Sequence, residues 1–458
     1  MCKKWIVCIV GFCTCLSLMA TPTKAQEAPD QQLSLENAIQ LAMKYNPELK
    51  SARLEVERSD ARVTEAWGYA LPSVNVSGRF TRTLKKPVFF LPDFSDLESG
   101  RILPVRIGSD YALDASVTAQ QILFNGAVIV GVGAARVYSR LSREMYTSKQ
   151  VETVTLVRKA YYSALIARAV VDLMHSSLLN AENNLKNVLL MRDQGIVSEY
   201  DELRASVQVD NLRPTVIQSE NNYELAIDAL RNAIGIEKST DLLIIDSLVF
   251  NPIDENIIAR AEELVLKSNP NLHSLDYQIE LNDAAISVER SNYLPTIAAF
   301  GQYQYQAAKN EFKFSTADLI SSSQIGLTLS LNIFQGLQTR ARVEQAQVDR
   351  LKSEEQRISL ERNLKTGVHS VVGNLRQARK RIEAQEKTVE TAERGYKIVT
   401  TRFLANAATQ LEVNDAELAL TQAKVNRIQA IYDYLNASAD LDQLMGHMPD
   451  YVAEMNNE

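Results

Sequence analysis

The side chains that most often carry out catalysis or bind metals are few and scattered in this chain. Its four histidines show no metal-binding spacing. The sequence also contains neither a nucleophile motif nor a glycine-rich loop that could hold a phosphate. We therefore expect no enzymatic activity, no cofactor and no metal site. The histidines are His175, His273, His369 and His447.

The cysteines lie together near the N-terminus, within a segment that begins with two lysines and continues as an apolar run over residues 5–19. Small residues at Thr23 and Ala25 suit signal peptidase, so the pattern predicts a secretory signal peptide over residues 1–25. A retained membrane anchor or a lipid-anchored cysteine is the alternative. After cleavage near Ala25 no cysteine would remain, which excludes disulfides and thiol chemistry. The cysteines are Cys2, Cys8, Cys13 and Cys15.

The charge and hydropathy of the remaining chain limit its partners. Loss of three lysines with the signal peptide leaves 46 basic residues against 56 acidic ones, a net charge of −10. An acidic chain without a basic block is a poor nucleic-acid binder, so we expect no nucleic-acid partner. No later apolar run has the length of a membrane helix. Any contact with lipid must therefore come from strands.

Four stretches alternate apolar and polar residues, which is typical of strands with one apolar and one polar face. They predict two β-hairpins over residues 73–124 and 296–334, with long loops at about 84–109 and 307–322. Each strand has about ten residues, the length that a tilted strand needs to cross a bilayer. The apolar positions expected to face lipid are Val74, Val76, Leu113, Val117, Tyr303, Tyr305, Leu327, Leu329 and Leu331.

Four strands cannot close a barrel, because about eight are needed to fill even the smallest interior. An open sheet edge in lipid would leave backbone groups without hydrogen bonds. The strands therefore predict a barrel shared between several chains. Two hairpins of a soluble sandwich are the alternative, although the neighbouring sequence offers no second sheet.

Internal repetition divides the chain into two halves. Asn46-Pro47 recurs as Asn269-Pro270, and Pro72 recurs as Pro295 at the same separation along the chain. Gly126 and Gly336 follow the last strand of each hairpin. Their separation along the chain is shorter than the separation between the repeated prolines. We therefore predict two structural repeats over residues 26–240 and 241–448, followed by a C-terminal tail over 449–458.

Long segments without proline predict very long helices over residues 126–194 and 336–404. Each would extend about 100 Å at 1.5 Å per residue, too long for a compact domain. Their apolar residues recur at spacings of three and four, as in coiled coils. Return helices are predicted over 198–235 and 408–446, and a further helix over 255–292. Pro214 is expected to kink the first return helix.

A polar turn separates each long helix from its return helix. In the first turn, Gly195 fits the left-handed conformation that ends many helices, and Ser198 can cap the next helix.

These motifs resemble those of the TolC family of outer-membrane efflux proteins. The residues that carry the resemblance are L-S-L-E-N-A-I-Q-L-A at 33–42 with N-P-E-L, the A-L-P and Y-L-P marks, the L-F-N-G and I-F-Q-G junctions, and R-D-Q-G-I-V-S-E-Y-D at the first turn. It extends from about Leu33 to Gly446. The order and duplicated spacing of these motifs are more specific than any one of them.

The resemblance implies a mixed α and β membrane protein in the outer membrane. Three identical chains would each contribute four strands to one twelve-stranded β-barrel, and long coiled-coil helices would form an α-barrel through the periplasm. It further implies a periplasmic adaptor, an inner-membrane pump and outer-membrane lipid as partners. The implied function is the exit duct of a tripartite export system, with efflux of drugs or other small molecules favoured. The alternatives are type I protein secretion and a periplasmic coiled-coil scaffold that transports nothing.

The resemblance also implies that the turns at the periplasmic end close the duct and contact the adaptor. To pair residues of the second turn with those of the first, we use the same distance along the chain that separates Gly126 from Gly336. Ala405 then occupies a position where glycine is common, and Leu411 one where an acid is common, which argues against an acidic ring in the second turn. The alternative is that the charged residues are ordinary solvated helix ends. The residues assigned to this gate or docking site are Arg192, Asp193, Gly195, Ser198, Asp201, Arg402, Ala405 and Ala408.

Overall fold

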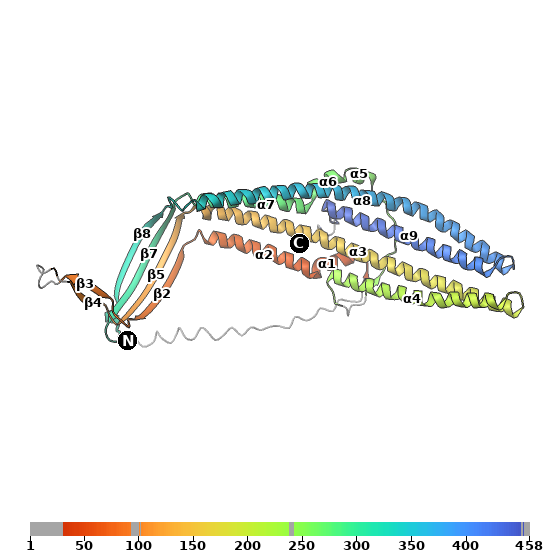
Figure 1. Cartoon of the computed structure of the whole chain (residues 1–458), viewed down its shortest axis with the longest axis horizontal. Coiled ribbons are helices and arrows are strands. Elements are labelled where there is room, and N and C mark those ends of the chain that lie inside the picture. The colour runs from red at the N-terminus through yellow and green to blue at the C-terminus, as the bar shows by residue number, and fades with distance from the viewer. Residues whose placement is uncertain (1–30, 93–99, 101, 238–241, 450–451, 453–458) are drawn as a thin grey trace.

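A four-stranded sheet stands at one end of an elongated molecule, and two helical hairpins reach toward the other end (Figure 1). The computed structural model describes residues 31–449 and 452, apart from residues 93–99, 101 and 238–241. The predicted signal peptide and all but residues 449 and 452 of the predicted tail lie outside the described residues.

The sheet has the strand order β2-β5-β7-β8, and every neighbouring pair is antiparallel. The predicted hairpins are therefore present and pair with each other through β5 and β7. β8 begins and ends earlier than predicted, because its pairing with β7 runs from Ile320 to Ser330. The strands are β2 (Ser73–Arg82), β5 (Tyr111–Phe124), β7 (Thr296–Lys309) and β8 (Ile320–Ser330).

The long loop of the first hairpin contains structure that the sequence analysis did not predict. Within it, β3 (Val88–Pro92) and β4 (Ile102–Arg106) form a small antiparallel hairpin that extends beyond the sheet (Figure 1). The loop of the second hairpin is shorter than predicted, because β7 continues to Lys309 before a short 3-10 turn at Thr316–Asp318.

The strands enter the long helices in two different ways. β5 contains a bulge between Ile122 and Phe124, and the next residue, Asn125, caps α3 (Gly126–Asp193) by accepting hydrogen bonds from two backbone N–H groups. By contrast, residues 331–337 lie between β8 and α8 (Gln338–Leu404). This second connection ends with Gly336 and Leu337 at φ +60° and +67°.

The long helices match their predicted ranges closely. α3 has 68 residues and α8 has 67, so each extends about 100 Å. They return as α4 (Glu199–Ile234) and α9 (Gln410–Met445), and α4 continues through Pro214. The helix predicted over 255–292 is instead three elements: Asn269-Pro270 begins the last of them, and a break at Arg260 divides the part before it. The shorter helices are α1 (Leu35–Tyr45), α2 (Pro47–Gly68), α5 (Glu255–Ala259), α6 (Ala261–Ser268) and α7 (Pro270–Ser291).

The repeated Asn-Pro marks tie each half of the chain together. Asn46 caps α2 and donates from Nδ2 to the carbonyl of Ala233 at 2.9 Å, while Asn269 caps α7 and donates to the carbonyl of Leu444 at 2.8 Å. Each asparagine therefore joins the start of one helix to the end of a return helix. Of the described helices, none is both long and apolar enough to cross a membrane.

Buried side chains gather where these elements meet, between the sheet and the helix tips. One core surrounds Tyr161 of α3, whose hydroxyl oxygen lies within hydrogen-bond distance of the carbonyl oxygen of Leu33, at 2.9 Å, and of the carboxylate of Asp246, at 2.7 Å. This core lies beside a short parallel pair, β1 (Gln31–Leu33) and β6 (Leu242–Ile244). A second core joins α6, α7, α8 and α9. Together they hold the long helices as one layered body.

Candidate functional site

The first candidate surface is the face of the sheet that carries the predicted apolar residues. Directly paired residues in neighbouring strands project to the same side. The register pairs Val76 with Val117, Val117 with Tyr303, and Ala299 with Leu327. Of the predicted positions, only Leu331 lies beyond the end of the strands. The register thus places the others on one face, which we call the apolar face: Val74, Val76, Leu113, Val117, Tyr303, Tyr305, Leu327 and Leu329.

The apolar face is uncovered in the single chain. Val76 is 73% exposed, Leu327 is 71% exposed and Ile325, on the same face, is 91% exposed. A contiguous exposed apolar surface of this kind marks a contact with another chain or with lipid.

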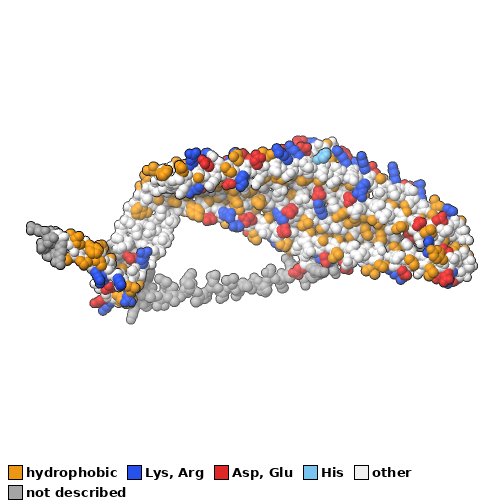
Figure 2. Space-filling model, viewed as in Figure 1, with side chains coloured by type: hydrophobic (Ala, Val, Ile, Leu, Met, Phe, Trp, Pro, Cys, Tyr) orange, Lys and Arg blue, Asp and Glu red, His pale blue; other side chains and the backbone are white. Residues whose placement is uncertain are grey.

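The opposite face of the sheet carries hydroxyl and amide groups, and we call it the polar face. Gln324 donates from Nε2 to Oε1 of Gln302 at 2.6 Å, and the hydroxyls of Ser77 and Ser116 lie 2.8 Å apart. The sheet surface turned to the viewer in Figure 2 is largely white, with few charged or hydrophobic side chains. The apolar face is therefore compatible with an apolar environment, and the polar face with water.

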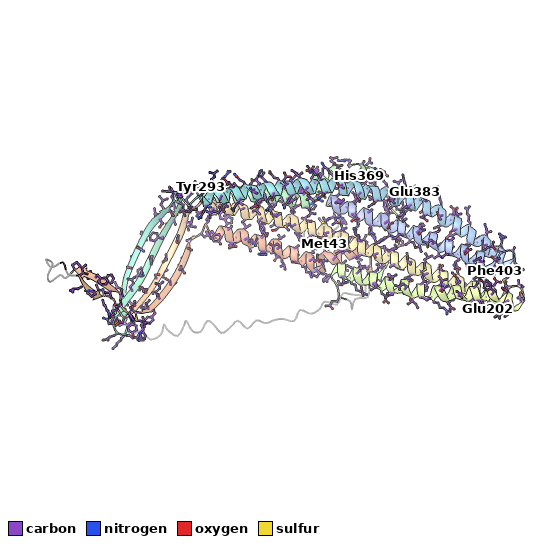
Figure 3. The ribbon with its side chains drawn as sticks, viewed as in Figure 1. Met43, Glu202, Tyr293, His369, Glu383 and Phe403 are labelled. Carbon is purple, nitrogen blue, oxygen red and sulfur yellow. The ribbon has the colours of Figure 1, made fainter. Side chains whose placement is uncertain are left out.

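Aromatic side chains lie at both ends of the strands. At the end beside β3 and β4, Phe80, Tyr111 and Phe312 form a cluster with ring centroids 5.4 to 6.2 Å apart. At the other end, Trp67 is exposed in the last turn of α2, and Tyr293 is exposed in the turn that leads into β7, where Figure 3 labels it. Aromatic residues at both ends of an apolar strand surface are typical of membrane–water interfaces.

The second candidate site is the pair of turns at the far end of the helices, which we call the first and second tips. In the first tip, Gly195 has φ +72°, and its N–H donates to the carbonyl of Arg192 at 2.8 Å. Ser198 accepts from the N–H of Asp201 at 3.3 Å, and the Asp201 carboxylate accepts from the N–H of Ser198 at 3.1 Å. The predicted glycine conformation and serine cap are both confirmed.

The second tip uses different residues for the same geometry. Asn406 has φ +57°, and its N–H donates to the carbonyl of Phe403 at 2.9 Å. Thr409 accepts from the N–H of Glu412 at 3.3 Å, and the Glu412 carboxylate accepts from the N–H of Thr409 at 2.7 Å. This hydrogen bond from the Thr409 backbone lowers the pKa of Glu412.

The distance along the chain between equivalent positions of the two tips is therefore one residue longer than the distance between Gly126 and Gly336. The predicted pairing of first-tip with second-tip residues, which was based on those glycines, is wrong by one residue. The reason is that α8 begins two residues after Gly336, whereas α3 begins at Gly126, and that α8 is one residue shorter than α3, which leaves a net shift of one residue. Ala405 and Ala408 do lie in the turn, but they are not the counterparts of the glycine and the cap. An acid, Glu412, therefore lies in the second tip at the position equivalent to Asp201. The equivalent pairs are Gly195 and Asn406, Ser198 and Thr409, and Asp201 and Glu412.

The arginines of the two tips have different partners. The Arg192 guanidinium lies 2.7 Å from the carboxylate of Asp193 and 2.5 Å from that of Glu202, and these carboxylates raise its pKa. Arg402 instead donates to the carbonyl of Ala407 at 2.8 Å. The arginine of the first tip thus forms ion pairs, whereas the arginine of the second tip forms a hydrogen bond to the backbone of its own turn.

A small apolar cluster joins the two tips. Val188 of α3, Ala205 of α4, Phe403 of α8 and Val413 of α9 are all buried within it. Figure 3 shows Phe403 and Glu202 at this end of the molecule. The two helical hairpins are therefore packed against each other close to their ends.

Sequence reasoning missed several residues of this region. The caps of the second tip were visible as T-x-x-E at 409–412, but the wrong alignment of the two turns hid them. Glu417 of α9 was also missed, although it is only 4% exposed. The available signal was an acidic residue on the packed face of α9, two helical turns after Gln410, which is buried on the same face. Burial raises the pKa of Glu417 to about 7.

The histidines do not assemble into a site. His175 lies 3.0 Å from the carboxylate of Glu220, and His273 lies 3.4 Å from that of Glu144. Within the described residues there is no group of three or more potential metal ligands.

Comparison with known proteins gives one family. The model of the outer membrane efflux protein family matches residues 38–236 and 262–447. The chain is 22% identical over 413 residues to the outer membrane protein TolC of Vibrio cholerae, covering 89% of this chain and 90% of that protein. It is 22% identical over 343 residues to the alkaline protease secretion protein AprF of Pseudomonas aeruginosa, covering 74% and 71%.

Solved structures share the fold. The Campylobacter jejuni CmeC outer membrane channel superimposes with a TM-score of 0.74 at 16% sequence identity, covering 92% of this chain and 88% of that one. The arrangement of sheet, long helices and tips therefore recurs in a known channel.

Proposed function

Since the chain belongs to the outer membrane efflux protein family, we propose how its sheet, long helices and tips work together. It is an outer membrane channel of the class that serves efflux or secretion. The observation that carries the proposal is a sheet with one apolar face, one polar face and, among the described strands, edges at β2 and β8 that no strand of the same chain covers.

Three copies of the chain complete one barrel. An open strand edge in lipid leaves N–H and C=O groups without partners, so β2 of one copy pairs with β8 of the next. Two copies would give eight strands, whose interior is filled by side chains, whereas three give twelve strands and room for an aqueous channel. The apolar face contacts lipid, and the polar face lines the channel.

The helices continue this channel into the periplasm. With three copies, α3, α4, α8 and α9 surround a tunnel about 100 Å long, and the tips stand at its periplasmic entrance. A periplasmic adaptor binds at the tips and connects the duct to an inner-membrane pump. The exposed tip residues offered to this adaptor include Asp193 and Tyr200.

The register gives a direct test of the two faces. Ile325→Arg places a charge on the apolar face near the middle of β8, where lipid exposure costs about 2–4 kcal/mol per copy. We expect loss of the heat-modifiable oligomer from the outer membrane. The measurement is the oligomer recovered in outer-membrane fractions, resolved by electrophoresis without heating.

The matched control is Gln324→Arg at the adjacent position on the polar face. It removes the hydrogen bond to Gln302, worth about 1 kcal/mol, but leaves the new charge in water. Its oligomer yield should stay near the wild-type value. Equal yields for both variants would contradict the assignment of lipid and channel faces.

Efflux of small molecules is the proposed use of the duct, and protein secretion is the second candidate because AprF is a secretion protein. Deletion of the gene should lower the inhibitory concentration of drugs and detergents several-fold, with no change in extracellular proteins. A deletion strain of unchanged drug sensitivity that loses one secreted protein would instead assign the duct to secretion.

A further inference from the structure

A buried carboxyl group lies next to the cluster that joins the two tips. Glu417 of α9 is 4% exposed, and neither of its carboxyl oxygens has a hydrogen-bond partner in the described part of the chain. It occupies the same seam of α9 as Val413 and Leu420, which are buried one turn to either side. An unpaired carboxylate in such a place is costly, because desolvation disfavours its charged form.

The groups around Glu417 offer it no opposite charge. From α8, half-buried Tyr396 faces it, and the raised pKa of this phenol, about 12, comes first from its own burial and then from Glu417. From α3, Ser177 contacts Thr421 of α9 at 3.1 Å, which places Ala181 at the level of Glu417.

Charged residues on the helices around Glu417 form ion pairs with one another. Lys424 of α9 contacts Glu393 of α8 at 3.0 Å. Arg213 of α4 lies 3.4 Å from Asp210 and 3.9 Å from Glu182 of α3. Burial is the cause that raises the pKa of Glu417, and none of these charged groups contributes to the shift.

We propose that Glu417 is a proton-binding position that controls the packing of the two tips: its neutral form holds the helical hairpins together, and loss of its proton to water favours their separation. The proposal goes beyond the duct function but rests on it for its purpose, which is to open the periplasmic entrance. Only a proton is exchanged with solvent, and no covalent bond changes.

The sign of the pH effect follows from linkage. Burial raises the pKa of Glu417 from its ordinary value of 4.5 to about 7 in the packed tips, so the packed state binds more protons than the separated one. Packing is therefore strongest at low pH and weakens as the pH rises from 4.5 toward 7. Above that range the effect levels off at a shift of about 300-fold in the packing equilibrium.

Accessibility of a buried thiol measures this separation without measuring transport. Val413, which is fully buried, is replaced by cysteine in a chain whose natural cysteines all lie within residues 1–25. The rate of modification by a water-soluble maleimide is measured in outer-membrane vesicles for Val413→Cys and for Val413→Cys with Glu417→Gln. The rate for Val413→Cys is divided by the rate for the chain that also carries Glu417→Gln. This ratio cancels the pH dependence of the thiol itself.

We expect this ratio to rise about tenfold or more between about pH 5 and about pH 8. Glu417→Leu, which fills the site with an apolar side chain, should protect the thiol as Glu417→Gln does. A ratio that does not change with pH, or thiols equally accessible in all three chains, would overturn the proposal.

Two controls isolate the position. Cysteine at Leu418, which is 64% exposed, should react at the same rate whether residue 417 is Glu or Gln. Glu390→Gln, at an exposed acid paired with Arg394 on α8, should leave the Val413→Cys rate unchanged at every pH. Because the vesicles already contain inserted protein, failure here would leave the duct proposal intact, whereas failure of the duct would show as absence of inserted oligomer.

Discussion

The two halves of the chain reach the same tip geometry by different connections. In the first half one residue, Asn125, separates the strand from the long helix, whereas residues 331–337 do so in the second. The return helices nevertheless have 36 residues each, and both end at a left-handed glycine, Gly235 and Gly446. The strand-to-helix connection can therefore vary while the helical hairpins keep their length.

The comparison also shows what makes two positions equivalent. Gly195 and Asn406 have different side chains but the same left-handed backbone, and Ser198 and Thr409 form the same cap. Backbone conformation and hydrogen bonding, rather than residue identity, define the correspondence between the tips.

The largest expected effect is at the glycines that end the return helices. A Cβ at Gly446 would lie 2.6 Å from the carbonyl oxygen of Ser268, and one at Gly235 would lie 2.8 Å from Cα of Asn46. Because backbone atoms cannot move aside and both residues have positive φ, alanine at either position should cost about 3 kcal/mol or more. The measurement is the thermal stability of the assembled oligomer.

Gly195→Ala provides the matched comparison. It has the same kind of positive φ, but a Cβ there would meet no atom within 4 Å. Only the backbone strain remains, about 1–2 kcal/mol. If Gly195→Ala were as damaging as Gly446→Ala, the close contact with the start of α7 could not be the reason for the glycine.

A smaller effect tests the one-residue correction in the second tip. Asn406→Gly should stabilise the turn by up to about 1 kcal/mol, because glycine adopts the left-handed conformation without steric cost. Ala405→Gly should destabilise it by about 0.5–1 kcal/mol, since Ala405 has φ −89° and gains nothing from glycine. Local opening free energies from hydrogen exchange at the tip provide the measurement.

The opposite signs are the important result. A stabilising Ala405→Gly with a neutral or harmful Asn406→Gly would restore the alignment based on Gly126 and Gly336 and contradict the observed tip geometry.

Much of the architecture follows from local patterns. Alternation in residues such as Val74 and Val76 predicts two-faced strands, and apolar residues three and four apart predict the long helices. Asn-Pro is a local signal for the helix starts observed at Pro47 and Pro270, although the single helix predicted over 255–292 passed over the second of them. The β3–β4 hairpin was missed because its short strands lie in a loop rich in proline, which obscures alternation.

The sequence by itself determined the four strands of the main sheet, the long helices with their return helices, and the two faces of the sheet, because strand alternation, heptad spacing and helix caps act between residues close in the chain. Tertiary structure decided which positions of the two tips are equivalent, the contacts that require Gly235 and Gly446, and the burial of Glu417. Each of these depends on how segments far apart in sequence are placed relative to one another, and local residue patterns do not encode that placement.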